Sequence, residues 1–205
     1  CRNRKRLPHD PVREPGHIKP QLMPEISLST LSLILGALTL GGGIWGITAR
    51  EQALEFVKGF PRNDNVGYFL ILSAMVWFLL ILKGESMSDF ERYRMHFNVF
   101  ILITGIGSCV YLKDFLAVRG SAVVMILLAK LIVDTARWHE SDWRLVLVTM
   151  AYLMVVVGMW LTASPWRMRD WIEYLTANEG RFKKVCIARA VLGVLLLVLG
   201  VTAFK

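Results

Sequence analysis

Six apolar runs alternate with short polar segments along this chain, and they cover residues 28–48, 66–82, 97–112, 121–136, 144–163 and 185–204. A helix that crosses a membrane needs about 17–25 predominantly apolar residues. The first, fifth and sixth runs meet this length, and flanking aromatic and basic side chains can extend the three shorter ones. The pattern predicts an all-α integral membrane protein with about six transmembrane helices. One short pair could instead form a re-entrant or interfacial segment.

Two connecting segments are near-copies of each other. The segment GIWGITAREQALEFVKGFPRN (residues 43–63) aligns without a gap to GMWLTASPWRMRDWIEYLTAN (residues 158–178). In both, a Gly-apolar-Trp sequence ends an apolar run, an amphipathic stretch follows, and an asparagine comes last. We predict three tandem helical hairpins, at residues 26–82, 97–136 and 144–204, of which the outer two are duplicates. The middle hairpin shares only Asp114-Phe115-Leu116 and has a shorter connector, so a triplication is left open.

The two long connectors are predicted to be amphipathic helices at the membrane surface. Four crossings separate the copies, so both connectors lie on the same face of the membrane. Phe56, Phe60, Trp166 and Trp171 are the expected interfacial anchors, because aromatic side chains favour the level of the headgroups. Such helices could form a platform for lipid or a partner subunit. They could also be structural elbows that hold two spans apart in the membrane plane.

The composition agrees with a membrane location. Hydrophobic residues make up 55% of the chain, the mean hydropathy is +0.48 and the formal charge is +8. A soluble protein this basic would suggest nucleic acid. Here the basic residues lie in residues 1–25 and between the apolar runs, which favours anionic lipid headgroups. We therefore expect membrane lipid as a partner and no nucleic acid.

Residues 1–25 form a basic, proline-containing tail before a membrane domain at residues 26–205. Such a composition predicts disorder for the tail on its own, so a protein partner is the simplest way to order it. Its charge also favours a cytoplasmic location for both chain termini. Cys1 could be an acylated lipoprotein cysteine, or the natural start could be elsewhere, for example at Met23.

Charged residues inside the apolar runs are functional candidates, because an intramembrane charge is costly. Lys130 and Asp134 are four residues apart, so they share a helix face and can pair. They could line an ion or proton path, or Lys130 could simply snorkel toward Asp134. Arg189 lies one turn inside the last run and is expected to snorkel to the surface. Gly42 and Gly46 form a GxxxG step, which predicts close helix packing within the chain or against a partner.

Known catalytic motifs are not found in the sequence. It holds no HExxH, GxSxG, phosphate-binding loop or dinucleotide fingerprint, and its three cysteines show no CxxC spacing. We expect no catalytic residue, no metal and no cofactor. Five acids near the terminal side could form a metal or proton-release site, although ordinary water-exposed connectors explain them as well. They are Glu85, Asp89, Glu91, Glu140 and Asp142, with His96 and His139 nearby.

The last sixty residues resemble a small bacterial inner-membrane family of unknown function, whose members are two-span hairpins. The resemblance covers about a quarter of the chain and rests on a Pro-Trp-Arg connector and a glycine in the second span. The matching residues are Gly158, Pro165, Trp166, Arg167 and Gly193. The resemblance implies a bacterial membrane setting and no particular chemistry. The first hairpin lacks the proline and the basic run.

Together these features favour a non-catalytic accessory or scaffolding subunit of a larger membrane protein complex. The main alternative is a small transporter or channel that uses Lys130 and Asp134. A third interpretation is an enzyme that acts on lipid through the five acids, which would require those acids to converge in one pocket.

Overall fold

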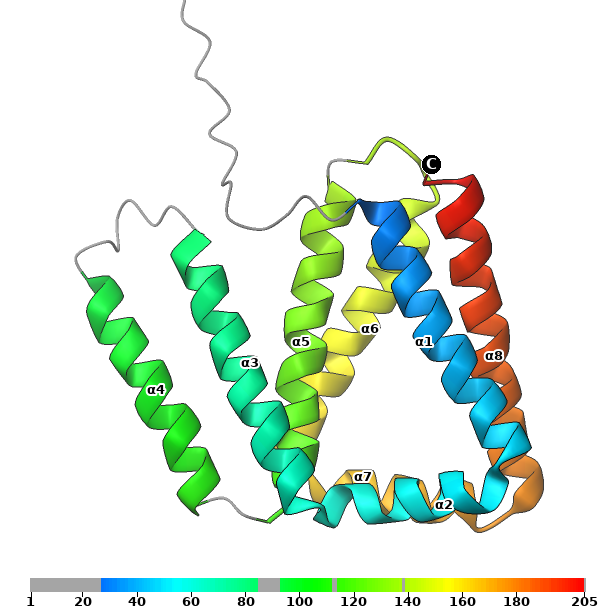
Figure 1. Cartoon of the computed structure of the whole chain (residues 1–205), viewed down its shortest axis with the longest axis horizontal. Coiled ribbons are helices and arrows are strands. Elements are labelled where there is room, and N and C mark those ends of the chain that lie inside the picture. Colours follow the sequence, from blue (N-terminus) through cyan, green and yellow to red (C-terminus); the bar gives the residue numbers. More distant parts are fainter. Residues whose placement is uncertain (1–26, 85–92, 112–113, 138, 205) are drawn as a thin grey trace, which may run out of the picture.

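The computed structural model describes residues 27–84, 93–111, 114–137 and 139–204, and these are helical almost throughout (Figure 1). The elements are α1 (Leu28–Thr48), α2 (Arg50–Gly59), the short 3-10 helix η1 (Phe60–Arg62), α3 (Asp64–Gly84), α4 (Arg94–Tyr111), α5 (Leu116–Arg137), α6 (Arg144–Ala163), α7 (Trp166–Thr176) and α8 (Glu179–Thr202). Within the described part, α1, α3, α5, α6 and α8 are long and apolar enough to cross a membrane. The apolar stretch of α4, Met95–Tyr111, is shorter. The chain is thus a multi-pass all-α membrane protein. The tail predicted for residues 1–25 lies outside the described residues.

Local hydrogen bonds set the helix starts. The Ser27 hydroxyl accepts the amide of Thr30 at 3.1 Å and caps α1. The side chain of Asn178 accepts the amide of Gly180 at 2.9 Å and caps α8. Asn63 accepts an amide in the same way, from the first turn of α3 at 3.2 Å. The asparagine that ends both copies of the repeat therefore starts the returning span in each, as expected for an N-cap residue.

The spans pack across hairpins rather than within them. α1 packs along α8, whereas α5 packs against both α6 and α3, and α4 packs against α3 at the edge of the molecule (Figure 1). α2 and α7 run side by side across one end, which we call the connector end. α1 begins and α8 finishes at the opposite, terminal end. The connectors therefore hold α1 apart from α3 and α6 apart from α8, in contrast to a simple antiparallel hairpin.

Close contact between α1 and α8 depends on glycines. A Cβ atom at Gly43 would lie 2.8 Å from the amide nitrogen of Ala190. A Cβ atom at Gly193 would lie 2.5 Å from the amide nitrogen of Leu40. Both distances are to backbone atoms, which cannot move aside as a flexible side chain can. Small residues thus let the two backbones approach, which is how membrane helices gain dispersion contacts.

Two serines fasten the terminal half of this seam. The buried Ser32 hydroxyl donates to the carbonyl of Leu196 at 2.6 Å, and Ser29 donates to the carbonyl of Gly200 at 2.7 Å. A hydroxyl that faced acyl chains without a partner would be unfavourable. These bonds therefore help to fix the register of α1 on α8.

Glycines also face a neighbouring span on α6 and α4. Gly158 of α6 lies against Ile126 and Ala122 of α5, and Gly105 of α4 lies against the side chain of Met75 on α3. Each of the long helices α1, α4 and α6 therefore packs on a helix that does not follow it directly in the sequence.

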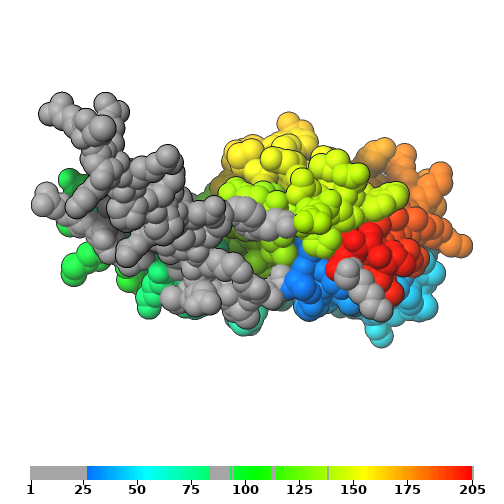
Figure 2. Space-filling model, turned by 90° about the horizontal axis from the view of Figure 1, so that it is seen from above, coloured from blue at the N-terminus to red at the C-terminus, as the bar shows by residue number. Residues whose placement is uncertain are grey.

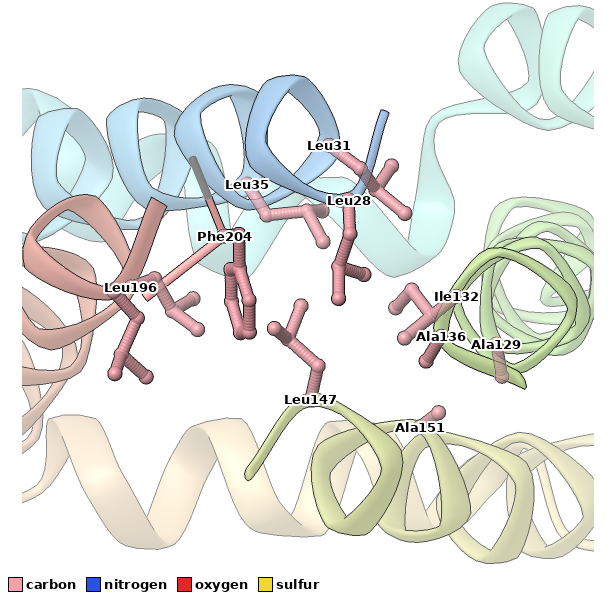
Figure 3. Packing of buried hydrophobic residues seen from close by; sticks show 11 residues of the cluster. Leu28, Leu31, Leu35, Ala129, Ile132, Ala136, Leu147, Ala151, Leu196 and Phe204 are labelled. Atoms are coloured by element: carbon pink, nitrogen blue, oxygen red, sulfur yellow. The ribbon is translucent and has the colours of Figure 1, made fainter. Parts of the chain in front are cut away.

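The largest buried cluster lies at the terminal end, where α1, α5, α6 and α8 converge (Figure 3). Leu147 projects from α6 toward Leu28 and Phe204 at its centre. Figure 2 looks onto this end and shows α1 and α8 side by side, with the connection between α5 and α6 next to them. The buried members are Leu28, Leu31, Leu35, Ala129, Ile132, Ala136, Leu147, Ala151, Leu196, Leu199 and Phe204.

Candidate functional site

Two elbows of the same construction lie at the connector end. At the first, α1 ends where the amide of Ala49 donates to the carbonyl of Trp45 at 2.9 Å. At the second, α6 ends where the amide of Ser164 donates to the carbonyl of Trp160 at 2.8 Å. Ala49 and Ser164 leave the helical conformation in a similar way, with φ −115° and ψ 53° in one and φ −134° and ψ 69° in the other. The sequence repeat is thus also a repeat of backbone structure.

Each elbow is closed by an edge-to-face aromatic pair. The ring centroids of Trp45 and Phe56 are 5.8 Å apart, and those of Trp160 and Trp171 are 6.0 Å apart. The two pairs occupy equivalent positions in the aligned repeats. All four rings remain substantially exposed. They can therefore lie among lipid headgroups while they hold each connector against the span before it.

The remaining expected anchors lie on the same connectors. Phe60 begins η1 and is partly buried, with its ring centroid 6.3 Å from that of Phe56. Trp166 begins α7 and is exposed. Asp114-Phe115-Leu116, the equivalent stretch of the middle hairpin, forms a turn that leads directly into α5, with Phe115 at φ 58°. Among the described residues, separate connector helices thus occur after α1 and after α6 and not before α5.

Polar contacts join the connectors to α8. Arg50, at the start of α2, donates to Glu179, at the start of α8, over 2.6 Å. Arg181 places its guanidinium carbon 4.3 Å from the ring centroid of Tyr174 on α7. Ala53 of α2 is buried beside residues of α8. Both connectors therefore contact the first turns of the same span.

The elbow pairs predict a measurable coupling. We expect a double-mutant cycle of Trp160→Ala and Trp171→Ala to give a coupling of about 0.5–1.5 kcal/mol in the free energy of unfolding, which is typical of edge-to-face pairs. A matched cycle of Trp160→Ala with Trp166→Ala should give a coupling close to zero. Unfolding in mixed micelles would measure both cycles, and equal couplings would contradict the elbow geometry.

Lys130 and Asp134 form an ion pair on the outer face of α5. The Lys130 ammonium donates to a carboxylate oxygen of Asp134 over 2.6 Å, and both side chains are partly exposed. Each residue is two positions from Ile132, which is fully buried in the terminal cluster. Two residues correspond to about 200° around a helix, so the pair lies nearly opposite to the side of α5 that enters the terminal cluster. The pair faces away from that cluster.

Toward the connector end, the pair α1 and α8 diverges from the pair α5 and α6 (Figure 1). Leu35 and Leu38 are on one stripe of α1, yet Leu35 is 8% exposed and Leu38 is 65% exposed. Leu196 and Leu192 are on one stripe of α8, and their exposures are 0% and 37%. The stripes that form the terminal cluster are therefore uncovered where the helix pairs diverge (Figure 1). We call this exposed apolar surface the wedge, and its residues on α1 and α8 are Leu38, Trp45, Val185 and Leu192.

Gly42 and Gly46, the predicted packing pair, have different neighbours on α8. A Cβ atom at Gly46 would lie 2.6 Å from Sγ of Cys186. A Cβ atom at Gly42 would lie 2.7 Å from the terminal nitrogen Nη2 of Arg189 and 2.8 Å from its Cζ. The guanidinium of Arg189 thus packs on the bare backbone of α1. The helix α8 begins at Glu179, six residues before the apolar run that contains Arg189.

The group of acids and histidines is only partly within the described residues. Glu85, Asp89 and Glu91 lie outside them, whereas Glu140 and Asp142 are exposed in the connection between α5 and α6. Nearby, His139 packs edge-on against the ring of Phe204 with centroids 5.3 Å apart, and its Nδ1 accepts the amide of Ser141. His96 is exposed on α4. Across the described ranges, no three His, Cys, Asp or Glu side chains are placed to hold a metal ion.

No protein-family model, curated protein or solved structure matches this chain. The resemblance of the last sixty residues to a two-span hairpin family therefore stays a prediction.

The sequence did not reveal two contacts of the connector end, Arg50 with Glu179 and Arg189 with Gly42. One sequence feature bears on both contacts: Asn178 followed by Glu179 is a helix-start pattern. This pattern places the first turn of α8 at Glu179 rather than at the start of the apolar run.

Proposed function

We propose that this chain is a non-catalytic accessory or scaffolding subunit of a larger membrane protein complex. The observation that carries the proposal is the Lys130–Asp134 ion pair on the outer face of α5. Charged side chains that face acyl chains are unfavourable. A neighbouring helix with a polar side chain can lower that cost through an additional hydrogen bond. The expected partner is thus a transmembrane helix that carries a polar or charged residue.

The depth of the pair supports this choice. Lys130 is seven residues before the end of α5, which corresponds to a rise of about 10 Å. Asp134 is three residues before the end, so the pair extends from the interior of the span toward the terminal face. A partner helix beside α5 would cover the ammonium, the deeper of the two charges. On the same face Val123 is exposed, which extends the surface toward the connector end.

A transporter or channel that uses this pair is the alternative function. Such a path would have to run along the outer face of α5, between this chain and a partner, because the pair does not face the wedge. In that case Lys130→Ala should abolish solute flux in liposomes that hold the assembled complex. The accessory role requires no such flux from this chain.

We further propose six crossings in a bacterial inner membrane, with α4 as the sixth. α3 runs toward the terminal end and α5 starts at the connector end, and α4 runs between these two ends beside α3 (Figure 1). Its mostly exposed apolar side chains suit acyl chains. The two elbows then lie at one membrane face, as the parity of six crossings requires.

Site-specific crosslinking tests the proposed partner surface. A photoreactive residue at Val123, on the face of the ion pair, should form an adduct of defined mass with one membrane protein in intact membranes. The control is Val191, which is exposed on α8 eleven residues before the end of that helix at Thr202. No protein adduct at Val123, or the same adducts at both positions, would contradict a partner on α5.

A further inference from the structure

We infer that the wedge binds one phospholipid with an anionic headgroup, whose phosphate is held by Arg189. This inference is independent of the partner proposed for α5, because the residues concerned are on α1 and α8. Three features carry it: the environment of the guanidinium, its position against Gly42 and the apolar surface around it.

The guanidinium has no countercharge on the helices that it touches. The segment Leu28–Thr48 that forms α1 contains no charged residue. On α8 the single acid is Glu179, ten residues before Arg189, and it is paired with Arg50. Among the described residues, no carboxylate forms an ion pair with Arg189. A cation at this depth in a span is unfavourable unless an anion or water reaches it.

The guanidinium also lies against α1 while Arg189 remains exposed. A Cβ atom at Gly42 would come within 3.1 Å of its Nε and closer still to Cζ and Nη2. The absence of a side chain at this position leaves room for the planar group beside the helix. A guanidinium can offer two parallel N–H donors, which match the oxygens of a phosphate.

The surface next to the guanidinium is apolar. Val185 and Leu192 are one turn before and one turn after Arg189 on α8, and both are exposed. On α1, Leu38 and Trp45 are one turn before and one turn after Gly42, and they are also exposed. One cation between apolar side chains fits an amphiphile with an anionic head, whose acyl chains lie along these residues.

The direction of the side chain selects the source of the amphiphile. Long side chains in a helix lean toward its N-terminus, and α8 starts at the connector end. Arg189 therefore leans toward the leaflet whose headgroups surround α2 and α7. An anionic phospholipid of that leaflet can bring its phosphate to the guanidinium while its chains remain in the bilayer.

Native mass spectrometry of the full chain in a neutral maltoside detergent would test the site. Dioleoylphosphatidylglycerol (DOPG) should bind as a single resolved lipid, and zwitterionic dioleoylphosphatidylcholine should bind more weakly. Arg189→Leu should raise the Kd for DOPG about tenfold or more, because a charge-assisted contact is lost. Lys184→Leu removes an exposed cation from another face of α8 and should change the Kd less than about twofold.

Two further variants separate the site from folding and from general charge. Arg189→Lys keeps the charge but lacks the planar fork, so it should fold and bind DOPG with intermediate affinity. Gly42→Leu keeps the arginine but fills the room for its planar group beside the helix, and it should weaken binding as well. The inference is overturned if Arg189→Leu and Lys184→Leu weaken DOPG binding equally, or if oleate or inorganic phosphate displaces the lipid at comparable concentrations.

Discussion

Gly43→Leu is expected to lower the free energy of unfolding by about 3 kcal/mol or more and to separate the connector halves of α1 and α8. Its side chain would enter a space in which the first added carbon already lies 2.8 Å from the Ala190 amide and 2.9 Å from the Cys186 carbonyl. Overpacking a tight contact costs about 1–3 kcal/mol when side chains can adjust. Here backbone atoms must move, so the upper part of that range or beyond is expected.

Gly41→Leu is the matched control on the same helix. A Cβ atom at Gly41 meets no atom within 4 Å, and the residue is exposed. Its substitution should lower the free energy of unfolding by no more than about 0.5 kcal/mol. The higher helix propensity of leucine can instead raise the free energy of unfolding by up to about 1 kcal/mol. Unfolding by dodecyl sulfate in mixed micelles would compare the two. Similar losses for both variants would contradict the α1–α8 seam.

Leu147→Ala is expected to lower the free energy of unfolding by about 2–5 kcal/mol, the range for large-to-small changes at well-packed sites. Leu147 is fully buried at the centre of the terminal cluster, where four spans meet (Figure 3). The loss removes dispersion contacts that lipid cannot restore, because the site is enclosed by protein.

Leu145→Ala provides the comparison for Leu147. Leu145 is two residues earlier on α6 and is 61% exposed, so lipid or detergent can replace the lost atoms. The change should cost less than about 1 kcal/mol. The same unfolding assay serves for both. If the two variants lost equal stability, the convergence of the spans at the terminal end would be wrong.

The elbows could be predicted from the sequence because their information is local. The Gly-apolar-Trp step, the amphipathic stretch and the final asparagine lie within one contiguous segment in each repeat. Their spacing determines where the span ends, which face of the connector is apolar and where the next helix starts. The edge-to-face contact of Trp160 with Trp171 then follows from a separation of eleven residues between the two rings, which is the same in both copies.

The packing partners of the spans could not be predicted in the same way. A hydrophobic run defines a span, but it does not say which other span its small residues contact. Gly43 could have faced α3, α8 or a second chain, and only the folded structure places Ala190 against it. Long connectors that hold consecutive spans apart make non-consecutive pairing feasible.

For the charged residues inside the spans, too, local features could be predicted from the sequence and packing partners could not. The four-residue spacing of Lys130 and Asp134 predicted their pairing, because it depends on one helix alone. Which face of α5 they occupy depends on where Ile132 packs, and that depends on α1 and α6. The contact of Arg189 with Gly42 could not be predicted, because it depends on the packing of α8 against α1.

The central claim, that this chain works as a subunit, is tested most directly by the native mass of the particle extracted from membranes in a mild detergent. The expected protein mass is larger than the 23.3 kDa of the chain, because the particle contains the chain plus a defined partner. The double variant Lys130→Leu with Asp134→Leu should fold and be released as the single chain. A wild-type particle that contains one copy of this chain and no other protein would contradict the claim.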